Sequence, residues 1–462
     1  MNVILIIIDT MRADYLGCYG NPWIRTPNMD RLASRSFVFD EAYAEGCPTL
    51  QARRALWTGR RTFPFADHKI VPGDVLNIQP GWMPLHDEDV CLSEMLLDAG
   101  YVTTYITDVP QVFKPGMNFH RGFISFEFIR GQGGDHLHTG YRIAGERSAC
   151  DSYVARNKQT GGRKNNVEAA LRDWEADCMA PRVFTAAMRW LEHNGGVEKF
   201  FLVVDSFDPH EPFDPPDYYT RLYTREQLLE RPYELVSPVG KTITEEEIVK
   251  RRAGHAGEIT MLDRWLGHFL ESVELMGLMD NTLICLLSDH GTMLGDHGMI
   301  HKGPDALFRG VARVPMMVRH PEGVGAGKRT DAMAYNMDLV PTIVEFAGVK
   351  AHERVVAKSL ASMMRGAADK GRPFVTSGFN SHVYYHDAQW DYCEHRRTGP
   401  MHLFDWKSDP QERRNLVKER PEIIREIKRR ILEEAGPTPP FEIEGFPPPP
   451  DFHKRFPMLF NA

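Results

Sequence analysis

The chain has 462 residues, of which 42% are apolar and 26% charged, and this composition excludes a disordered or fibrous protein. Its net charge of −8 provides no basic field for nucleic acid, and no apolar run is long enough to span a bilayer, so we expect neither partner. The seven cysteines are scattered without metal-type pairs, which favours reduced thiols and a cytoplasmic protein.

The first predicted element is a buried strand at residues 2–8. Its continuous β-branched run is typical of a parallel strand covered on both faces, and it is too short and lacks the positive lead-in for a signal peptide. Asp9 follows directly, at the strand end where open parallel sheets bind ligands. We therefore expect Asp9 to bind a ligand; a helix cap for the residues after it is the alternative.

Residues 46–61 read Gly-Cys-Pro-Thr-Leu-Gln-Ala-Arg-Arg-Ala-Leu-Trp-Thr-Gly-Arg-Arg. A helix that begins at Thr49 places free N–H groups and the positive end of its dipole beside the hydroxyl, and it puts Arg53 on the same face one turn later. This arrangement suits a nucleophile with a cationic partner. An ordinary helix cap at Thr49 with a solvated arginine pair is the alternative.

Strand-like and helical patterns then alternate over about 350 residues, which is typical of a doubly wound α/β domain. Strands are expected at residues 102–106, 200–204, 283–287 and 315–318, and helices at residues 92–97, 184–191, 259–275 and 338–348. The interval 108–182 is rich in Gly, His and Arg, which favours long loops over the active edge instead of more sheet.

Two motifs with chemical potential follow the ends of predicted strands. Asp289 and His290 come directly after residues 283–287, with Lys302 beyond them, and can offer one oxygen and one nitrogen to a metal. His210 lies between two prolines after residues 200–205, where a rigid backbone could hold it to protonate a leaving group. Ordinary loop positions remain the alternative for both motifs.

We expect three units along the chain. Residues 1–370 form a catalytic domain, and residues 371–436 form a smaller unit with strand-like aromatics and a charged helix at 421–434. The proline-rich tail at 437–462 cannot form its own core and should extend across its own or a neighbouring subunit. This tail leads us to expect a homo-oligomer.

Six stretches together resemble the sulfatase-like branch of the alkaline phosphatase superfamily. They are residues 2–20 (NVILIIIDTMRADYLGCYG), 42–60, 208–213 (DPHEPF), 288–303 (SDHGTMLGDHGMIHKG), 338–348 (DLVPTIVEFAG) and 403–416 (LFDWKSDPQERRNL). They follow the family's order over nearly the whole chain. The resemblance implies an α/β fold with a large doubly wound mixed sheet flanked by helices and a small C-terminal α+β subdomain.

The nucleophile motif departs from the family's pattern. Sulfatases of this group carry Cys-x-Pro-x-Arg before Thr-Gly-Arg, and the cysteine becomes formylglycine. Alignment on residues 58–60 puts Thr49 at the nucleophile position and Arg53 at the arginine, whereas Cys47 is two residues too early, so we expect no formylglycine. A sulfated threonine cannot revert to an aldehyde, but a phosphothreonine can be hydrolysed in line, which favours phosphate esters.

Two further departures point the same way. Residues 107–110 read Thr-Asp-Val-Pro where the similar sulfatases carry Gly-Lys-x-His, so the substrate-contacting Lys and His of that motif are missing. Thr10 stands where the family has a second acid after Asp9, and with His290 the expected ligand set is similar to that of phosphonate monoester hydrolases and phosphodiesterases. An imidazole among fewer carboxylates favours one Mn²⁺ or Zn²⁺ over Ca²⁺ or Mg²⁺.

The resemblance therefore implies a metal-dependent hydrolase of a small anionic ester, either a phosphate diester or a phosphonate monoester, acting through phosphothreonine. The expected metal ligands are Asp9, Thr49, Asp289 and His290, the catalytic groups Thr49, Arg53, His210 and Lys302, and the substrate-binding groups Tyr105 and Thr107. A sulfatase without formylglycine, a phosphoryl transferase and a catalytically silent binding homologue are the alternatives.

Overall fold

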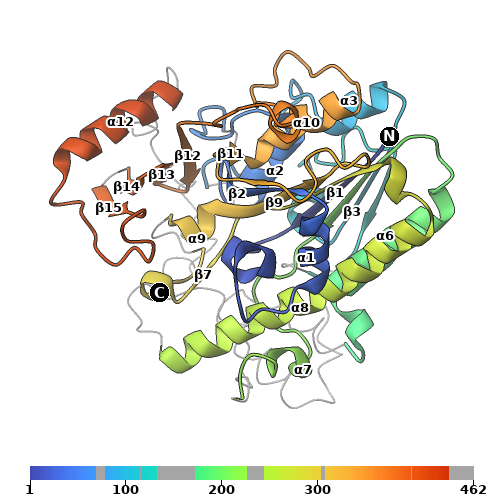
Figure 1. Cartoon of the computed structure of the whole chain (residues 1–462), viewed down its shortest axis with the longest axis horizontal. Helices are drawn as coiled ribbons and strands as arrows, with labels where there is room; N and C mark the ends of the chain where they lie inside the picture. The colour runs from blue at the N-terminus through green and yellow to red at the C-terminus, as the bar shows by residue number, and fades with distance from the viewer. Residues whose placement is uncertain are drawn as a thin grey trace.

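A computed structural model of the protein describes residues 1–68, 79–114, 116–132, 135, 172–225, 244–302, 307–396 and 398–435. A large mixed sheet lies between two layers of helices, and a smaller sheet with its own helix lies at one side (Figure 1). The predicted fold class, a doubly wound mixed sheet flanked by helices with a small C-terminal subdomain, is confirmed.

The main sheet has nine strands within the described residues, in the order β10-β2-β9-β6-β1-β5-β3-β4, with β11 paired to β2. Their bounds are β1 (Asn2–Ile8), β2 (Phe37–Tyr43), β3 (Val102–Thr107), β4 (Ser125–Phe128), β5 (Phe200–Ser206), β6 (Thr282–Ser288), β9 (Arg313–Arg319), β10 (Arg329–Thr330) and β11 (Ala334–Tyr335). The central strand β1 is parallel to both β5 and β6, whereas β9 runs antiparallel to β6 and β2.

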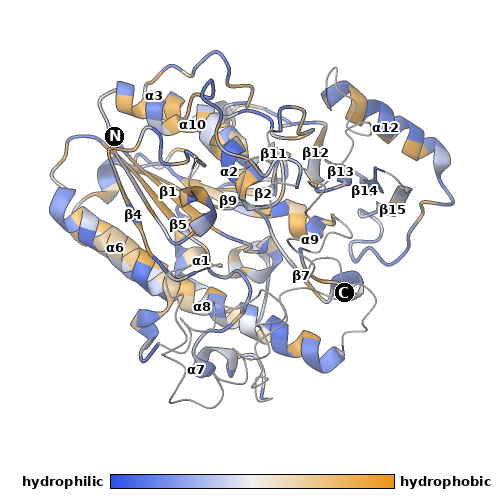
Figure 2. Ribbon diagram, turned by 180° about the vertical axis from the view of Figure 1, so that it is seen from behind, coloured by the Kyte–Doolittle hydropathy of each residue, from blue (hydrophilic) through white to orange (hydrophobic). Residues whose placement is uncertain are grey.

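Helices cover both faces of β1, as its continuous apolar run predicts. Residues 3, 5 and 7 pack toward α2 (Thr49–Thr58), α3 (Leu92–Asp98) and α10 (Leu339–Phe346). Residues 4, 6 and 8 pack toward α1 (Pro27–Ser34), α6 (Met179–Asn194) and α8 (Glu245–Leu275). Figure 2 shows the hydrophobic strands lying between these amphipathic helices.

Three short helices and a short hairpin lie outside the main sheet and its long helices. They are the helices α7 (Asp217–Thr220), α9 (Arg309–Ala312) and α11 (Ala361–Met364), and the hairpin of β7 (Met293–Leu294) and β8 (Ile300–His301). The hairpin carries the segment between His290 and Lys302, so it connects two of the predicted site residues.

The smaller sheet is antiparallel and consists of β12 (Phe374–Phe379), β13 (His382–Asp387), β14 (Trp390–His395) and β15 (Gly399–Asp405). The charged helix α12 (Pro421–Ala435) packs on it through Ile424, Ile427 and Ile431. The predicted tail at residues 437–462 lies outside the described residues.

Some elements differ from the prediction. The interval 108–182 is not all loop, because β4 adds an edge strand beside β3 and α6 already begins at Met179; residues 136–171 lie outside the described part. The helix predicted at 259–275 begins earlier, at Glu245, where Thr244 and Glu247 form a capping box. Strand β2, which is antiparallel to β9 and parallel to β10 and β11, was not predicted, because Asp40 and Glu41 interrupt its apolar run.

The described residues contain no helix long and apolar enough to cross a membrane.

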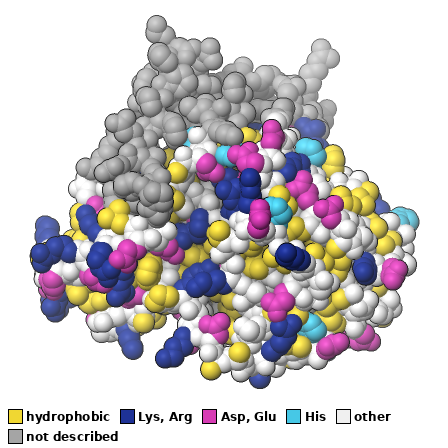
Figure 3. Space-filling view, turned by 90° about the horizontal axis from the view of Figure 1, so that it is seen from above, with side chains coloured by type: hydrophobic (Ala, Val, Ile, Leu, Met, Phe, Trp, Pro, Cys, Tyr) yellow, Lys and Arg dark blue, Asp and Glu magenta, His cyan; other side chains and the backbone are white. Residues whose placement is uncertain are grey.

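The six cysteines among the described residues are all free thiols. Figure 3 shows acidic and basic side chains intermixed over the face in view.

Candidate metal centre and active site

Three strands bring acidic residues to the carboxyl edge of the main sheet. Asp9 follows β1, Asp289 follows β6, and Asp205 is the penultimate residue of β5. All three side chains are fully buried. Because β1 pairs in parallel register with both β5 and β6, these carboxylates meet at the edge where doubly wound sheets bind ligands.

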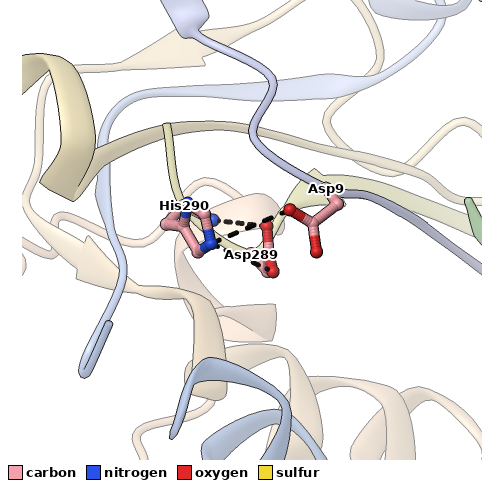
Figure 4. A group of neighbouring side chains, drawn as sticks. All are labelled: Asp9, Asp289 and His290. Carbon is pink, nitrogen blue, oxygen red and sulfur yellow. Dashed lines mark hydrogen bonds and ion pairs between the residues drawn. The ribbon is translucent and has the colours of Figure 1, made fainter. Parts of the chain in front are cut away.

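Asp9, Asp289 and His290 form a group whose potential ligand atoms all lie within 4.8 Å of one another. Nε2 of His290 lies 3.8 Å from Oδ1 of Asp9 and 3.6 Å from Oδ2 of Asp289, and Figure 4 shows the imidazole facing both carboxylates. Nδ1 of His290 donates to the carbonyl oxygen of Gly291 at 2.8 Å, so Nε2 keeps its lone pair.

The group fits a divalent metal. Oδ1 of Asp9 and Nε2 of His290 are buried and have no hydrogen-bond partner among the described residues. Buried polar atoms are normally paired, so two unpaired atoms that face each other indicate a ligand between them. One imidazole with two carboxylates is a donor set that suits Mn²⁺ or Zn²⁺.

Gly291 fixes the loop that carries His290. Its N–H donates to the carbonyl oxygen of Val311 at 2.7 Å. A Cβ atom at this position would lie 2.1 Å from the carbonyl oxygen of Gly310, so the two chain segments approach too closely for any side chain. The imidazole is therefore held by backbone contacts on a rigid turn.

Arg53 connects all three acids. Its guanidinium pairs with Asp205 through two hydrogen bonds, Nε to Oδ2 at 3.0 Å and Nη2 to Oδ1 at 2.7 Å. Nη1 donates to Oδ2 of Asp9 at 3.1 Å and to Oδ2 of Asp289. It also lies 3.3 Å from the carbonyl oxygen of Thr49. Arg53 is fully buried, and its guanidinium is paired with the two candidate metal-binding acids and with Asp205.

Burial and neighbouring charges shift the pKa values of Asp9, Asp289 and His290. Burial and the adjacent Asp289 carboxylate raise the pKa of Asp9 well above its ordinary value. Burial also opposes ionisation of Asp289, but His290 and Arg53 together hold its pKa at about 2. Burial lowers the pKa of His290 to about 4, so the imidazole is neutral at pH 7 and can bind a metal.

Thr49 is the first residue of α2 and is buried. Nη1 of Arg53 donates to the carbonyl oxygen of Thr49 as well as to Asp9 and Asp289. The start of the helix therefore lies beside these two candidate metal-binding acids. Cys47 lies two residues earlier and is fully buried, with its Sγ 4.0 Å from Oγ of Ser377. Burial raises the pKa of this thiol far above its ordinary value, which favours the neutral thiol over the thiolate.

His210 and Lys302 meet at Glu211. The His210 ring stacks on Phe207 with 4.0 Å between centroids, and its Nδ1 donates to the carbonyl oxygen of Glu211 at 2.7 Å. Nζ of Lys302 lies 3.7 Å from Oε1 of Glu211. Burial, together with the charge of Lys302, lowers the pKa of His210 to about 3, although Glu211 opposes this shift. His210 is thus neutral in the free protein.

A family model described as Sulfatase matches residues 1–349. The chain belongs to the sulfatase family. A second model, described as N-sulphoglucosamine sulphohydrolase, C-terminal, matches residues 295–436, which include the smaller sheet and α12. The predicted resemblance to the sulfatase-like branch is confirmed, and the protein is an ester hydrolase of the alkaline phosphatase superfamily.

Curated relatives match almost the whole chain. An arylsulfatase of Clostridium perfringens is 27% identical over 94% of this chain and 94% of its own. The multifunctional alkaline phosphatase superfamily protein PehA of Trinickia caryophylli is 25% identical over 90% of this chain and 91% of its own. The crystal structure of a phosphonate monoester hydrolase of Agrobacterium radiobacter matches with a TM-score of 0.72 at 20% identity, covering 94% of this chain and 95% of that one.

Tyr105 and Thr107 are the two residues predicted to bind substrate. Both are fully buried in this sulfatase-family fold. The Tyr105 hydroxyl donates to Oδ2 of Asp205 at 2.7 Å, and the Thr107 hydroxyl accepts from the N–H of Val109 at 3.0 Å. Both hydroxyls therefore have protein partners, and substrate binding by either residue stays a prediction.

Asp205 was not among the predicted site residues. Asp205 could have been predicted, because it lies near the carboxyl end of a buried parallel strand, as Asp9 does. The structure shows why it belongs to the site: Asp205 makes the two-bond pair with Arg53.

Proposed function

We propose that this sulfatase-family chain hydrolyses phosphate diesters or phosphonate monoesters with Thr49 as its nucleophile. The observation that carries the proposal is a threonine, and no oxidisable cysteine, at the start of α2 beside Asp9, Asp289 and His290. The nearby Cys47 is buried and lies two residues too early, because Gln51 and not an arginine follows it four residues later.

The residue type selects the chemistry. A sulfated formylglycine can release sulfate by reverting to the aldehyde, but a sulfated threonine needs attack by water. A phosphothreonine can be hydrolysed by in-line attack. Threonine at position 49 therefore favours phosphorus esters over sulfate esters, although the relatives include an arylsulfatase.

In the proposed reaction, Oγ of Thr49 forms a bond to phosphorus while the bond from phosphorus to the leaving oxygen breaks. The leaving oxygen keeps that electron pair and takes a proton, and the hydroxyl proton of Thr49 goes to solvent. The oxygen of a water molecule then forms a bond to phosphorus while the bond from phosphorus to Oγ of Thr49 breaks, and a proton from that water restores the hydroxyl. A divalent metal held by Asp9, Asp289 and His290 would supply Lewis-acid stabilisation of the attacking oxygen.

Lys302 and His210 are the proposed substrate-side groups. Lys302 is 11% exposed at its side chain and can neutralise a non-bridging oxygen. His210 is the proposed proton donor for the leaving group. Because its pKa is about 3 in the free protein, a bound anion must raise that pKa before His210 can carry a proton.

The test compares aryl phosphate monoesters, aryl phosphate diesters, phosphonate monoesters and aryl sulfates on the Mn²⁺-reconstituted chain. We expect the diester or the phosphonate monoester to give the highest kcat/KM. Thr49→Ala should reduce turnover by at least ~10³-fold, because it removes the nucleophile. Thr58→Ala is the matched control, since Thr58 is a buried threonine of the same helix whose hydroxyl donates to the carbonyl oxygen of Arg54.

A sulfatase without formylglycine is the second candidate, because relatives such as the Clostridium perfringens protein are named arylsulfatases. A preference for aryl sulfate would establish it over the phosphorus esters. Undiminished turnover in Thr49→Ala would exclude a threonine nucleophile in either reaction.

A further inference from the structure

Asp205 contacts a different edge of the Arg53 guanidinium from the edge that contacts Asp9 and Asp289. It occupies both Nε and Nη2 of the guanidinium, while Nη1 is left to contact Asp9 and Asp289. A carboxylate that binds one edge of a guanidinium with two hydrogen bonds fixes the plane of the group. Asp205 thereby determines where Nη1 points.

Tyr105 in turn holds Asp205. Its hydroxyl donates to Oδ2 of Asp205 at 2.7 Å, and both side chains are fully buried. Their strands are adjacent, since β5 lies between β3 and β1 in the sheet. The order Tyr105, Asp205, Arg53 therefore runs across three neighbouring elements and ends at the metal ligands.

The direction of Nη1 has a consequence for the two metal ligands. Nη1 takes Oδ2 of Asp9 and Oδ2 of Asp289, and this leaves Oδ1 of Asp9 without a partner among the described residues. If Asp205 did not occupy Nε and Nη2, these nitrogens could turn toward Oδ1 of Asp9 and compete with a cation for that oxygen. Asp205 also offsets part of the positive charge of Arg53.

We infer that Asp205, supported by the Tyr105 hydroxyl, is a positioning residue that holds Arg53 in place so that Asp9 and Asp289 remain available to a divalent metal. The inference rests on the metal site of the proposed function, but it does not depend on whether the ester contains phosphorus or sulfur. It assigns Tyr105 a role through Asp205 instead of through substrate.

The experiment titrates Mn²⁺ alone into the metal-stripped full-length chain by isothermal calorimetry. Asp205→Asn keeps the shape of the side chain and removes its charge, and we expect it to weaken Mn²⁺ binding by about tenfold or more. Tyr105→Phe removes only the hydroxyl and should weaken binding by about threefold to tenfold. If Asp205→Asn fails to fold, Tyr105→Phe carries the test alone.

Tyr384→Phe is the matched control. Tyr384 is a fully buried tyrosine whose hydroxyl donates to the buried Asp391 in the smaller sheet. Its removal should leave Mn²⁺ affinity within about twofold of wild type. The double variant of Asp205→Asn and Tyr105→Phe should bind Mn²⁺ no more weakly than Asp205→Asn, because Tyr105 acts through Asp205.

Turnover of bis(4-nitrophenyl) phosphate at saturating Mn²⁺ gives a second measurement. Since Asp205 does not contact substrate in the proposed scheme, kcat should fall while KM stays within about twofold. Wild-type Mn²⁺ affinity in both single variants would overturn the inference. Absence of Mn²⁺ binding by the wild-type chain would instead overturn the metal site of the proposed function, so the two failures are distinguishable.

Discussion

Replacement of Arg53 by methionine gives a stability test of the buried charge group. Arg53 pairs with Asp9, Asp205 and Asp289, and all four side chains are fully buried. Removing one partner of a buried ion pair costs about 3–5 kcal/mol. For a chain of 462 residues, an unfolding entropy of about 2 cal/mol/K per residue makes 1 kcal/mol equal to roughly 1 °C in Tm. We therefore expect Arg53→Met to lower the Tm in EDTA by about 3–5 °C.

Metal should rescue part of this loss. Mn²⁺ at 100 times its Kd stabilises a folded protein by about 2.7 kcal/mol, or roughly 3 °C here. In Arg53→Met the cation takes the place of the guanidinium as the positively charged partner of Asp9 and Asp289. The cation is also no longer repelled by the positive charge of Arg53. The increase in Tm from EDTA to Mn²⁺ should therefore be larger in Arg53→Met than in wild type, as measured by calorimetry at one scan rate.

Arg372→Met is the matched control, because Arg372 pairs at 2.8 Å with the fully buried Asp338, away from the metal ligands. This variant should lose stability to a similar extent in EDTA and in Mn²⁺. The reasoning is refuted if the Mn²⁺-dependent increase in Tm is no larger in Arg53→Met than in wild type, or if Arg372→Met shows the same metal dependence.

Two further predictions concern buried residues that do not act on a substrate. Burial lowers the pKa of His255 to about 3, so between about pH 3 and 6.5 the unfolded chain binds the extra proton, and stability falls with falling pH by up to roughly 5 kcal/mol. His255→Asn should flatten this acid limb in urea unfolding at pH 4.5 and 7, and an unchanged limb contradicts the assignment. Cys47→Ser should leave kcat within about twofold, and the intact mass of the wild-type peptide should show an unmodified cysteine, whereas an aldehyde mass would return the nucleophile to Cys47.

The sequence predicted the parts of the site that depend on strand ends. Asp9, Asp289 and His290 follow long apolar runs, and parallel register brings the ends of such runs to one edge. The start of α2 at Thr49 was also predictable, because the helix signals are local: the turn-forming residues precede it and Gly59 ends it. These features depend on neighbouring residues and on the general rules of α/β sheets.

The orientation of side chains could not be predicted in the same way. Tyr105 and Thr107 lie on the correct strand, but which partner each hydroxyl contacts depends on the packing of β5 beside β3. The position of Arg53 likewise depends on Asp205, which is more than 150 residues away along the chain. Long-range pairings of this kind leave no periodic signal in a single sequence.

The net charge of the site bears on the charge of the substrate, and the residue at position 49 bears on whether the substrate is a phosphorus ester or a sulfate ester. If a divalent cation binds as proposed, the three ionised carboxylates of Asp9, Asp205 and Asp289 are balanced by that cation and by Arg53. Under the proposed function, such a neutral site with limited further positive charge favours a monoanion, such as a diester or a phosphonate monoester, over a dianionic phosphate monoester. A sulfate ester is also a monoanion, so charge alone does not separate sulfur from phosphorus. Under the proposed function Thr49 would supply that distinction, because an ester formed on its hydroxyl would have to be cleaved by water.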